Sequence, residues 1–331
     1  MVLVHAKSPC CRARVNRFGS RRRQCVACKK TWRIRSKKRG RKPIRVHPKI
    51  EKMAFASSES LRHKAQRLKK GRELVRRRHS QGMDTLIKKL PFSEVPPGSL
   101  IAIVDGWIQF FDETPYTLHL ILLRSTHSTR AILTQPIILA GHEDIHGWKK
   151  AFSLLDPAIF NRICAVVSDG VSGLNVYARE HNWISQRCHI HLIRTLYPLL
   201  GKRNSTAKHK KLRARMYQCI LEILKIPDHK RAKQLVSQLS KMAYCPYCPK
   251  WFAFRTRGFL KQYQDFRSYL NHPELNLPKT TNSAESVFRL LSDTLRQTRG
   301  FRTPQAMEKW ITLQFKIIKS IKCNGVTHQP N

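Results

Sequence analysis

Short apolar runs bounded by polar turns fill the middle of the chain, from about residue 99 to residue 188. The runs LIAIVD, TLHLILL, AILTQPIIL and ICAVVSD have the length and the branched side chains typical of buried strands. Apolar residues at helical spacing occupy 144–156, and a further helix is expected over 172–181, before a short strand at WISQRCH. The pattern therefore predicts three strands, a helix, a strand, a helix and a strand.

That order of elements is the order of a ribonuclease-H-like domain. Residues 192–270 instead show helical periodicity with basic faces, and amphipathic helices are expected over 283–298 and 304–322. We therefore expect an α/β ribonuclease-H-like domain that contains an all-α insertion and is completed by the last helices.

Two short helical patterns lie upstream, over residues 60–82, and meet around Lys69–Gly71. They resemble a helix-turn-helix whose second helix, Arg72 to His79, would sit in a major groove with Arg72, Arg76 and Arg77 facing DNA. A single basic helix lying on phosphates fits nearly as well. Prolines then mark a boundary near residue 95.

The charge is large and uneven. The chain carries 64 Lys and Arg against 20 Asp and Glu, a net charge of +44. Residues 1–90 hold 30 basic and 4 acidic residues, residues 91–200 hold 8 and 9, and residues 201–331 hold 26 and 7. Basic flanks around a near-neutral core indicate a polyanionic partner, which we expect to be DNA.

No apolar run approaches the about 18 residues that a membrane span needs, and the N-terminus lacks a signal-peptide core. We therefore expect a protein without a membrane partner, in the cytoplasm. In that reducing compartment, the ten cysteines favour metal binding over disulfides.

Cys25 and Cys28 form a C-x-x-C knuckle, a spacing that lets two thiolates hold one Zn²⁺. The adjacent Cys10 and Cys11 are expected to complete the site, with His5 as an alternative fourth ligand. A module of about 35 residues buries too little apolar surface to fold without such a link, so we predict a zinc ribbon. The competing interpretation is a set of free cysteines in a basic tail.

Asp105 and Asp169 each end a predicted buried strand and are followed by glycine. Ligand-binding residues gather at the carboxyl ends of such strands, so the two carboxylates are expected side by side. Glu285, at the head of the predicted helix 283–298, is the candidate third carboxylate. Three oxygen donors suit Mg²⁺ (or Mn²⁺), and two such ions about 3.5–4 Å apart catalyse phosphodiester chemistry. The alternatives are aspartates that cap turns and a Glu285–Arg289 pair; the acidic neighbours Asp112, Glu113, Glu143 and Asp144 lie in predicted turns, which counts against them.

The segments VDGW, VVSDGVSGL, QRCHIHLIR and TTNSAES…RQTRGF, around Asp105, Asp169, Cys188 and Glu285, closely resemble the DDE transposases of bacterial insertion sequences. The C-x-x-H just after the second aspartate resembles the Mutator-like superfamily, and the resemblance covers about residues 95–322. It implies metal-dependent cleavage at the terminal inverted repeats of an element, followed by attack of the freed 3′-hydroxyl on target DNA. The ribbon departs from the family's usual C-P-x-C, because Ser8-Pro9-Cys10-Cys11 stands there.

Two further groups carry hypotheses. Cys188 and His191 would form a second zinc site with Cys245 and Cys248, or would be a packed cysteine and a helix-capping histidine. Three arginines that flank the helix of Glu285 are expected to contact phosphates: Arg296, Arg299 and Arg302.

We thus predict a zinc ribbon at 1–45, a basic helix-turn-helix-like segment and linker at 46–95, a ribonuclease-H-like core at 96–191, a helical insertion at 192–278, and C-terminal helices at 279–331. The function expected is a DNA transposase that works as a homodimer or larger assembly on DNA. A non-catalytic DNA-binding regulator and a ribonuclease-H-like nuclease without strand transfer are the other functions considered.

Overall fold

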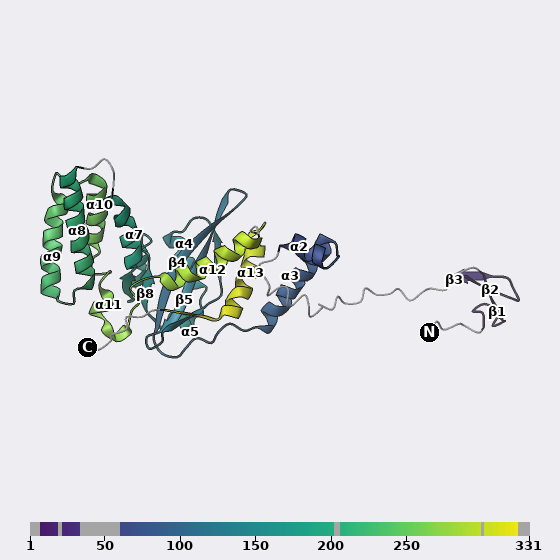
Figure 1. Cartoon of the computed structure of the whole chain (residues 1–331). Coiled ribbons are helices and arrows are strands. Elements are labelled where there is room, and N and C mark those ends of the chain that lie inside the picture. Colours follow the sequence, from purple (N-terminus) through teal and green to yellow (C-terminus); the bar gives the residue numbers. More distant parts are fainter. Residues whose placement is uncertain (1–6, 19–21, 34–59, 202–205, 299–300, 324–331) are drawn as a thin grey trace. The chain divides into compact units, whose positions relative to one another are not determined.

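The computed structural model describes residues 7–18, 22–33, 60–201, 206–298 and 301–323. The chain divides into two compact units, Met1–His47 and Pro48–Asn331 (Figure 1). His5 and Arg299, which the sequence raises as a zinc ligand and a phosphate contact, lie outside the described residues.

The smaller unit is an antiparallel sheet with the strand order β1-β2-β3. Its strands are β1 (Val15–Arg17), β2 (Arg22–Cys25) and β3 (Thr31–Arg33). Within the described part of this unit, the side chains that become buried are small, Ser8 and Cys25. Hydrophobic burial of that size does not hold a domain together, so the unit depends on a further link between its turns.

The larger unit is built on a sheet with the strand order β10-β6-β5-β4-β8-β9, and β7 pairs with β5. β4 runs antiparallel to β5 but parallel to β8, and β8 runs parallel to β9. The strands are β4 (Leu100–Phe111), β5 (Thr114–Ser125), β6 (Arg130–Leu133), β7 (Ile137–Ala140), β8 (Ile163–Ser168), β9 (Ile184–Arg187) and β10 (Ser320–Lys322).

Successive side chains of each strand point to opposite faces of this sheet, and a hydrophobic core lies on each face. Ile101 and Ile103 of β4 pack with one pair of helices, α12 (Asn282–Thr298) and α13 (Pro304–Ile318). Ala102 and Val104 pack on the other face with α4 (Ile145–Ser153) and α6 (Leu174–Glu180). A short α5 (Pro157–Phe160) leads into β8. These layers confirm the predicted mixed α/β class.

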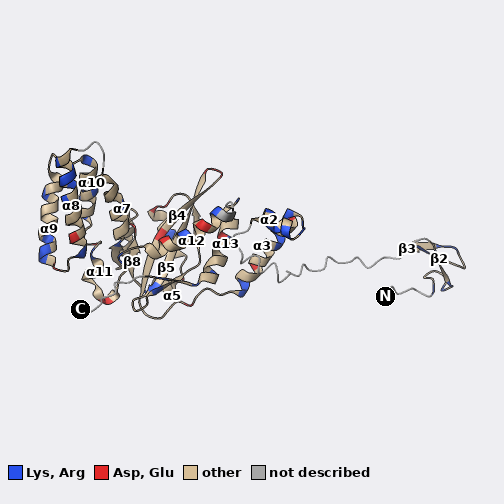
Figure 2. Ribbon diagram, in the orientation of Figure 1, with Lys and Arg blue, Asp and Glu red and all other residues tan. Residues whose placement is uncertain are grey.

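A helical segment separates β9 from α12. Its elements are α7 (His189–Leu200), α8 (Ala207–Lys225), α9 (His229–Tyr244), α10 (Lys250–Lys261), α11 (Ser268–Asn271) and the 3₁₀ turn Pro273–Leu275. It has its own apolar core, around Met216, Ile220 and Phe252. Its outer faces carry many Lys and Arg side chains (Figure 2).

The basic helices α2 (Leu61–Arg67) and α3 (Arg72–Lys89) pack against each other. The predicted second helix, Arg72 to His79, is too short, because Met83 and Leu86 bury into the core beneath α13 and extend α3 by several turns. Arg72, Arg76 and Arg77 lie exposed in its first turns, where Arg76 and Arg77 also pair with Glu73.

Two other predicted boundaries are wrong. β4 does not end at Asp105 but continues to Phe111, since it forms a long hairpin with β5. The helix expected over 304–322 ends at Ile318, because Lys319 adopts a left-handed φ of 64° that no α-helix continues through. Ser320–Lys322 then pair with the edge strand β6 as β10. Across the described part of the chain, every helix is too short or too polar to cross a bilayer.

Trp148 is the largest side chain that is completely buried, and its ring contacts His119 and Phe152. We expect Trp148→Ala to lower the free energy of unfolding by about 3–5 kcal/mol, because the sheet cannot collapse into so large a void. Chemical denaturation measures this change. Trp251→Ala is the matched control: Trp251 is 67% exposed, so its loss should change stability by no more than about 0.5 kcal/mol.

Candidate active site and cysteine cluster

The parallel pairing of β4 and β8 brings Asp105 and Asp169 together. The ladder ends where Ile103 pairs with Val167; Asp105 lies two residues farther along β4, and Asp169 directly follows β8. By alternation with Ile103, the Asp105 side chain points to the face that α12 covers. Burial, and then the negative charge of the nearby Asp169, raises the pKa of Asp105 to about 8.

Arg187 holds the backbone that carries Asp169. Its Nη2 donates to the carbonyl oxygens of Asp169, at 3.0 Å, and of Gly170, at 3.3 Å. Gly170 has a φ of 103°, and a Cβ there would meet the same guanidinium group. A residue with a side chain would therefore be strained after Asp169 and would displace Arg187.

Glu285 reaches this edge of the sheet from the first turn of α12. The segment before α12 is bonded to the start of α7: the backbone N–H of His189 donates to Lys279 O at 2.9 Å, and that of Thr281 donates to Cys188 Sγ at 3.4 Å. Farther along α12, Phe288 stacks on Trp107, two residues after Asp105, with ring centroids 6.1 Å apart. α7 and α12 thus both begin near the two aspartates.

Arg194 of α7, and not Arg289, is the ion-pair partner of Glu285. Its Nη1 donates to Glu285 Oε1 at 2.7 Å, and the Glu285 side chain is 23% exposed. Asp105 and Asp169 thus lie at the end of the β4–β8 ladder, whereas Glu285 lies in the first turn of α12 and is held by Arg194. Among the described residues, the three acids do not form a group with converging ligand atoms.

Glu143 is a residue that sequence reasoning set aside. It lies in the bend before α4, as expected, but its carboxylate occupies the space where a Cβ of Gly106 would be. Trp148 Nε1 donates to its Oε1 at 3.0 Å. Burial, and then the charge of Asp169, raises the pKa of Glu143 to about 7. The only sequence signal was the glycine after Asp105, which leaves room for this approach.

His191 stands between Cys188 and the acids. Hydrogen bonding to Cys188 is the main cause that raises the pKa of His191 to about 9, and the charges of Asp105 and Asp169 add to it. An imidazolium at this place offsets part of the negative charge of the aspartates.

The structure does not bring the four residues of the suggested second zinc site together. Cys188 is buried beneath Thr281, whereas Cys248 packs in the core of the helical segment, with its Sγ 3.6 Å from Met216 Sδ. Among the described residues, these four do not appear as a group with converging ligand atoms. Of the alternative, the packed cysteine is confirmed, since Cys188 is buried at the start of α7. The helix-capping histidine is wrong, because His191 lies inside α7, which has no side-chain cap.

The basic residues around α12 are exposed. Arg296 pairs with Asp293 at 3.7 Å, and Arg302 lies at the surface before α13. Within the described part of the chain, neither of these two side chains packs into a core.

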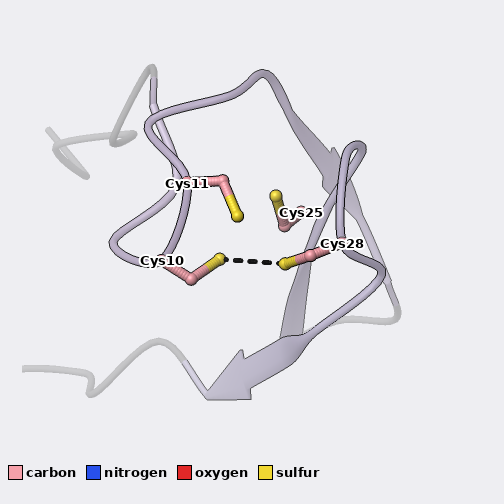
Figure 3. Close-up of side chains that lie close together, drawn as sticks. All are labelled: Cys10, Cys11, Cys25 and Cys28. Atoms are coloured by element: carbon pink, nitrogen blue, oxygen red, sulfur yellow. Dashed lines mark hydrogen bonds between the residues drawn. The ribbon is translucent and has the colours of Figure 1, made fainter.

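The four cysteines of the smaller unit gather at one point (Figure 3). The Sγ atoms of Cys10, Cys11, Cys25 and Cys28 lie within 4.8 Å of one another, and Cys10 Sγ and Cys28 Sγ are 3.3 Å apart. A tetrahedral zinc site with Zn–S bonds of about 2.3 Å requires sulfur–sulfur distances of about 3.8 Å. The cluster therefore has the composition and size of a structural Cys₄ zinc site.

The two turns that carry these four cysteines have the same backbone conformation. This match explains why Cys10 and Cys11 are adjacent. In the turn after β2, Cys25 N–H donates to Lys30 O, Lys29 N–H donates to Cys25 O, and Lys29 has a φ of 58°.

In the first turn, Ser8 N–H donates to Ala13 O, Arg12 N–H donates to Ser8 O, and Arg12 has a φ of 52°. Ser8 thus stands where Cys25 stands in the other knuckle, and Cys11 matches Cys28. Cys10 supplies the sulfur that Ser8 lacks.

Comparison with known proteins identifies the family to which this chain belongs. The model for the family described as "Transposase, Mutator family" matches residues 125–318, a span that runs from the end of β5 to the end of α13. A search of curated proteins finds no match. The matched span is more than half of the chain and includes Asp169, the Cys188–His191 pair and Glu285. The chain belongs to the Mutator family of transposases.

Proposed function

We propose that this protein is a DDE transposase that cleaves DNA at the ends of an insertion sequence and transfers the strand to target DNA. Asp105, Asp169 and Glu285 are the catalytic acids of this proposal. The observation that carries it is the meeting of Asp105 and Asp169 at the end of the β4–β8 ladder, with the first turn of α12 beside them, in a chain of this family.

The donor set fits Mg²⁺ or Mn²⁺, which prefer carboxylate oxygens. The buried carboxylate of Asp105 and the half-buried carboxylate of Asp169 repel each other, and a divalent cation between them would remove that cost. When bound, such ions activate the attacking oxygen and stabilise the leaving oxygen. Asp105 and Asp169 would hold them, and Glu285 would join once Arg194 releases its carboxylate.

The chain's own groups would then position the DNA. Arg187 keeps the Asp169 loop fixed, and the N-terminal ends of α7 and α12 direct their partial positive charge toward the phosphate at the edge of the sheet. Arg194, freed from Glu285, has the geometry to bind a phosphate oxygen in its place. The ribonuclease-H-like architecture expected from the sequence would supply this scaffold, with α7–α11 as its insertion.

End recognition falls in this proposal to the zinc-bound ribbon and to α3, where Arg72, Arg76 and Arg77 are exposed. Arg296 and Arg302, with Arg299, would bind phosphates beside the active site. Pairing of two element ends requires two copies of the protein, so the active form is a homodimer or larger.

One experiment separates this function from the alternatives. The protein is incubated with Mg²⁺ and a plasmid that bears the terminal repeats of its element. Cleavage with joining to target DNA supports the transposase; cleavage alone indicates a ribonuclease-H-like nuclease, and binding alone indicates a regulator.

The raised pKa of Asp105 predicts how stability depends on pH without added divalent cation. Its pKa is about 8 in the folded protein against 3.8 unperturbed, so between these values the folded state holds a proton that the unfolded state has lost. The contribution of this group to the free energy of unfolding therefore falls as pH rises from about 4 to about 8. Urea denaturation across that range should show a steeper fall for the wild type than for Asp105→Asn; parallel curves would contradict the assignment.

A further inference from the structure

A cleft opens directly beside Asp169, between the catalytic sheet and the helical segment. Its volume is about 790 Å³. α7 forms one wall through His191 and Thr195, and α10 forms the other through Phe254, Gly258 and Lys261, with Arg187 between them. Any polymer that occupies this cleft also reaches Asp169, one of the proposed catalytic acids.

The α10 wall combines exposed aromatic rings with cations. Phe254 is 63% exposed and Tyr244, also in the cleft, is 62% exposed. Arg255 lies 6.0 Å from the centroid of the Phe254 ring, and Arg257 lies 4.5 Å from that of Tyr244. Residues 244–261 contain no Asp or Glu. The wall is therefore suited to a partner that has flat apolar faces and negative charge.

These aromatic rings do not serve the core of the helical segment. The buried face of α10 includes Phe252, Ala253 and Phe259, which belong to the core of the helical segment, where α10 packs against α9 and α7. Trp251 and Phe254 lie on the opposite face, with their ring centroids 6.4 Å apart. Exposure of large rings side by side costs solvation and is typical of binding surfaces.

Gly258 keeps the middle of this wall open. It lies one helical turn beyond Phe254, and a Cβ built on it meets no atom within 4 Å. Glycine inside a helix costs about 1 kcal/mol relative to alanine, so folding alone would favour a larger residue here. The free space is part of the cleft.

We propose that this cleft binds unpaired DNA next to the scissile phosphate, with bases stacked on Phe254 and Tyr244 and phosphates on Arg255 and Lys261. The proposal rests on the proposed function and names the form of the substrate at that site. A paired base has no free face to stack on a protein ring, whereas an unpaired base stacks on any aromatic side chain without regard to sequence. The cations complement the phosphates between such bases.

The test uses the full chain and two duplexes of arbitrary sequence, one blunt and one with an unpaired tail that contains 2-aminopurine. We expect tighter binding of the tailed duplex, and a loss of 2-aminopurine fluorescence as the base stacks. Phe254→Ala should weaken tail binding about tenfold and restore the fluorescence, without a change in blunt-duplex binding.

Gly258 supplies a matched pair of variants that fold at least as well as the wild type. Gly258→Glu places a carboxylate in the open space and should also weaken tail binding about tenfold, because it repels phosphate. Gly258→Ala adds only a methyl group and should bind the tail as the wild type does.

Equal affinity for tailed and blunt duplexes, or a tail preference that Phe254→Ala leaves intact, would overturn the proposal. Equal weakening of both duplexes by Gly258→Glu would overturn it too, since the cleft would then hold paired DNA. The binding assay needs no cleavage, so Asp105→Asn protein is included. A tail preference in a protein that never cleaves DNA would contradict the transposase and not the cleft, whereas cleavage without a tail preference would contradict the cleft alone.

Discussion

Asp169→Asn is expected to lower the rate of DNA cleavage by about 10³-fold or more while binding to the element's ends stays nearly unchanged. Asparagine keeps the shape of the side chain but loses the charge that, in the proposed function, would hold a divalent cation between Asp169 and Asp105. Metal ions contribute several kcal/mol of transition-state stabilisation, and about 4 kcal/mol corresponds to about 10³-fold in rate. The rate of strand nicking at a terminal repeat, measured with saturating protein, gives this effect.

Asp112→Asn is the matched control for this change. Asp112 is an exposed acid in the turn of the β4–β5 hairpin with a φ of 46°, a conformation that asparagine adopts readily. Its rate of cleavage should equal that of the wild type. Retained cleavage in Asp169→Asn would remove this residue from the catalytic site.

The third carboxylate can be identified in the same assay. Glu285 is placed by α12 and paired with Arg194, whereas Glu143 is half-buried beside Gly106 and accepts a hydrogen bond from Trp148. We expect Glu285→Gln to lose cleavage as Asp169→Asn does. If instead Glu143→Gln abolishes cleavage and Glu285→Gln does not, the catalytic set consists of Asp105, Asp169 and Glu143.

Cys10→Ser is expected to abolish zinc binding by the ribbon and, with it, specific binding to the element's ends. Structural zinc contributes about 10–16 kcal/mol in small modules, and the ribbon buries little else that holds it together. Cys25, which would share the zinc ion with Cys10, has a lowered pKa. The backbone N–H of Cys28 and the Ser8 hydroxyl donate hydrogen bonds to its sulfur and lower the pKa of Cys25 to about 6, which favours the thiolate that zinc binds. Zinc content per chain and affinity for a terminal repeat are the measurements.

Because the two turns have matching backbones, a second substitution should restore the zinc site that Cys10→Ser removes. Ser8 occupies the place of Cys25, so the double change Ser8→Cys with Cys10→Ser should restore both zinc and end binding by completing an ordinary C-P-x-C knuckle. Cys164→Ser, which alters a half-buried cysteine of β8, should leave the zinc content unchanged. Full zinc in Cys10→Ser protein would show that another group supplies the fourth ligand.

Much of this protein follows from its sequence because the signals are local. Apolar runs locate β4, β5 and β8, the C-x-x-C spacing marks the knuckle, and the surplus of Lys and Arg indicates a nucleic-acid partner. That Asp105 and Asp169 lie near each other could also be predicted, since both follow apolar runs that form neighbouring parallel strands; their catalytic role stays a prediction. The ends of the helices were harder to predict. α3 is longer than predicted because its burial under α13 cannot be seen in the sequence of α3 itself. α13 is shorter than predicted because the residues after it pair with the edge strand β6.

Other features depend on which segments meet in space. Glu143 faces Asp169 only because β7 pairs with β5 next to β4, and Glu285 pairs with Arg194 only because α7 and α12 start side by side. Cys188 and Cys248 lie in different cores, although their spacing suggested one zinc site. The sequence by itself determined the elements, the charge and the kinds of ligand present, because these depend on neighbouring residues. Only the tertiary structure decided which side chains come together, since distant segments are brought into contact by packing that no local pattern records.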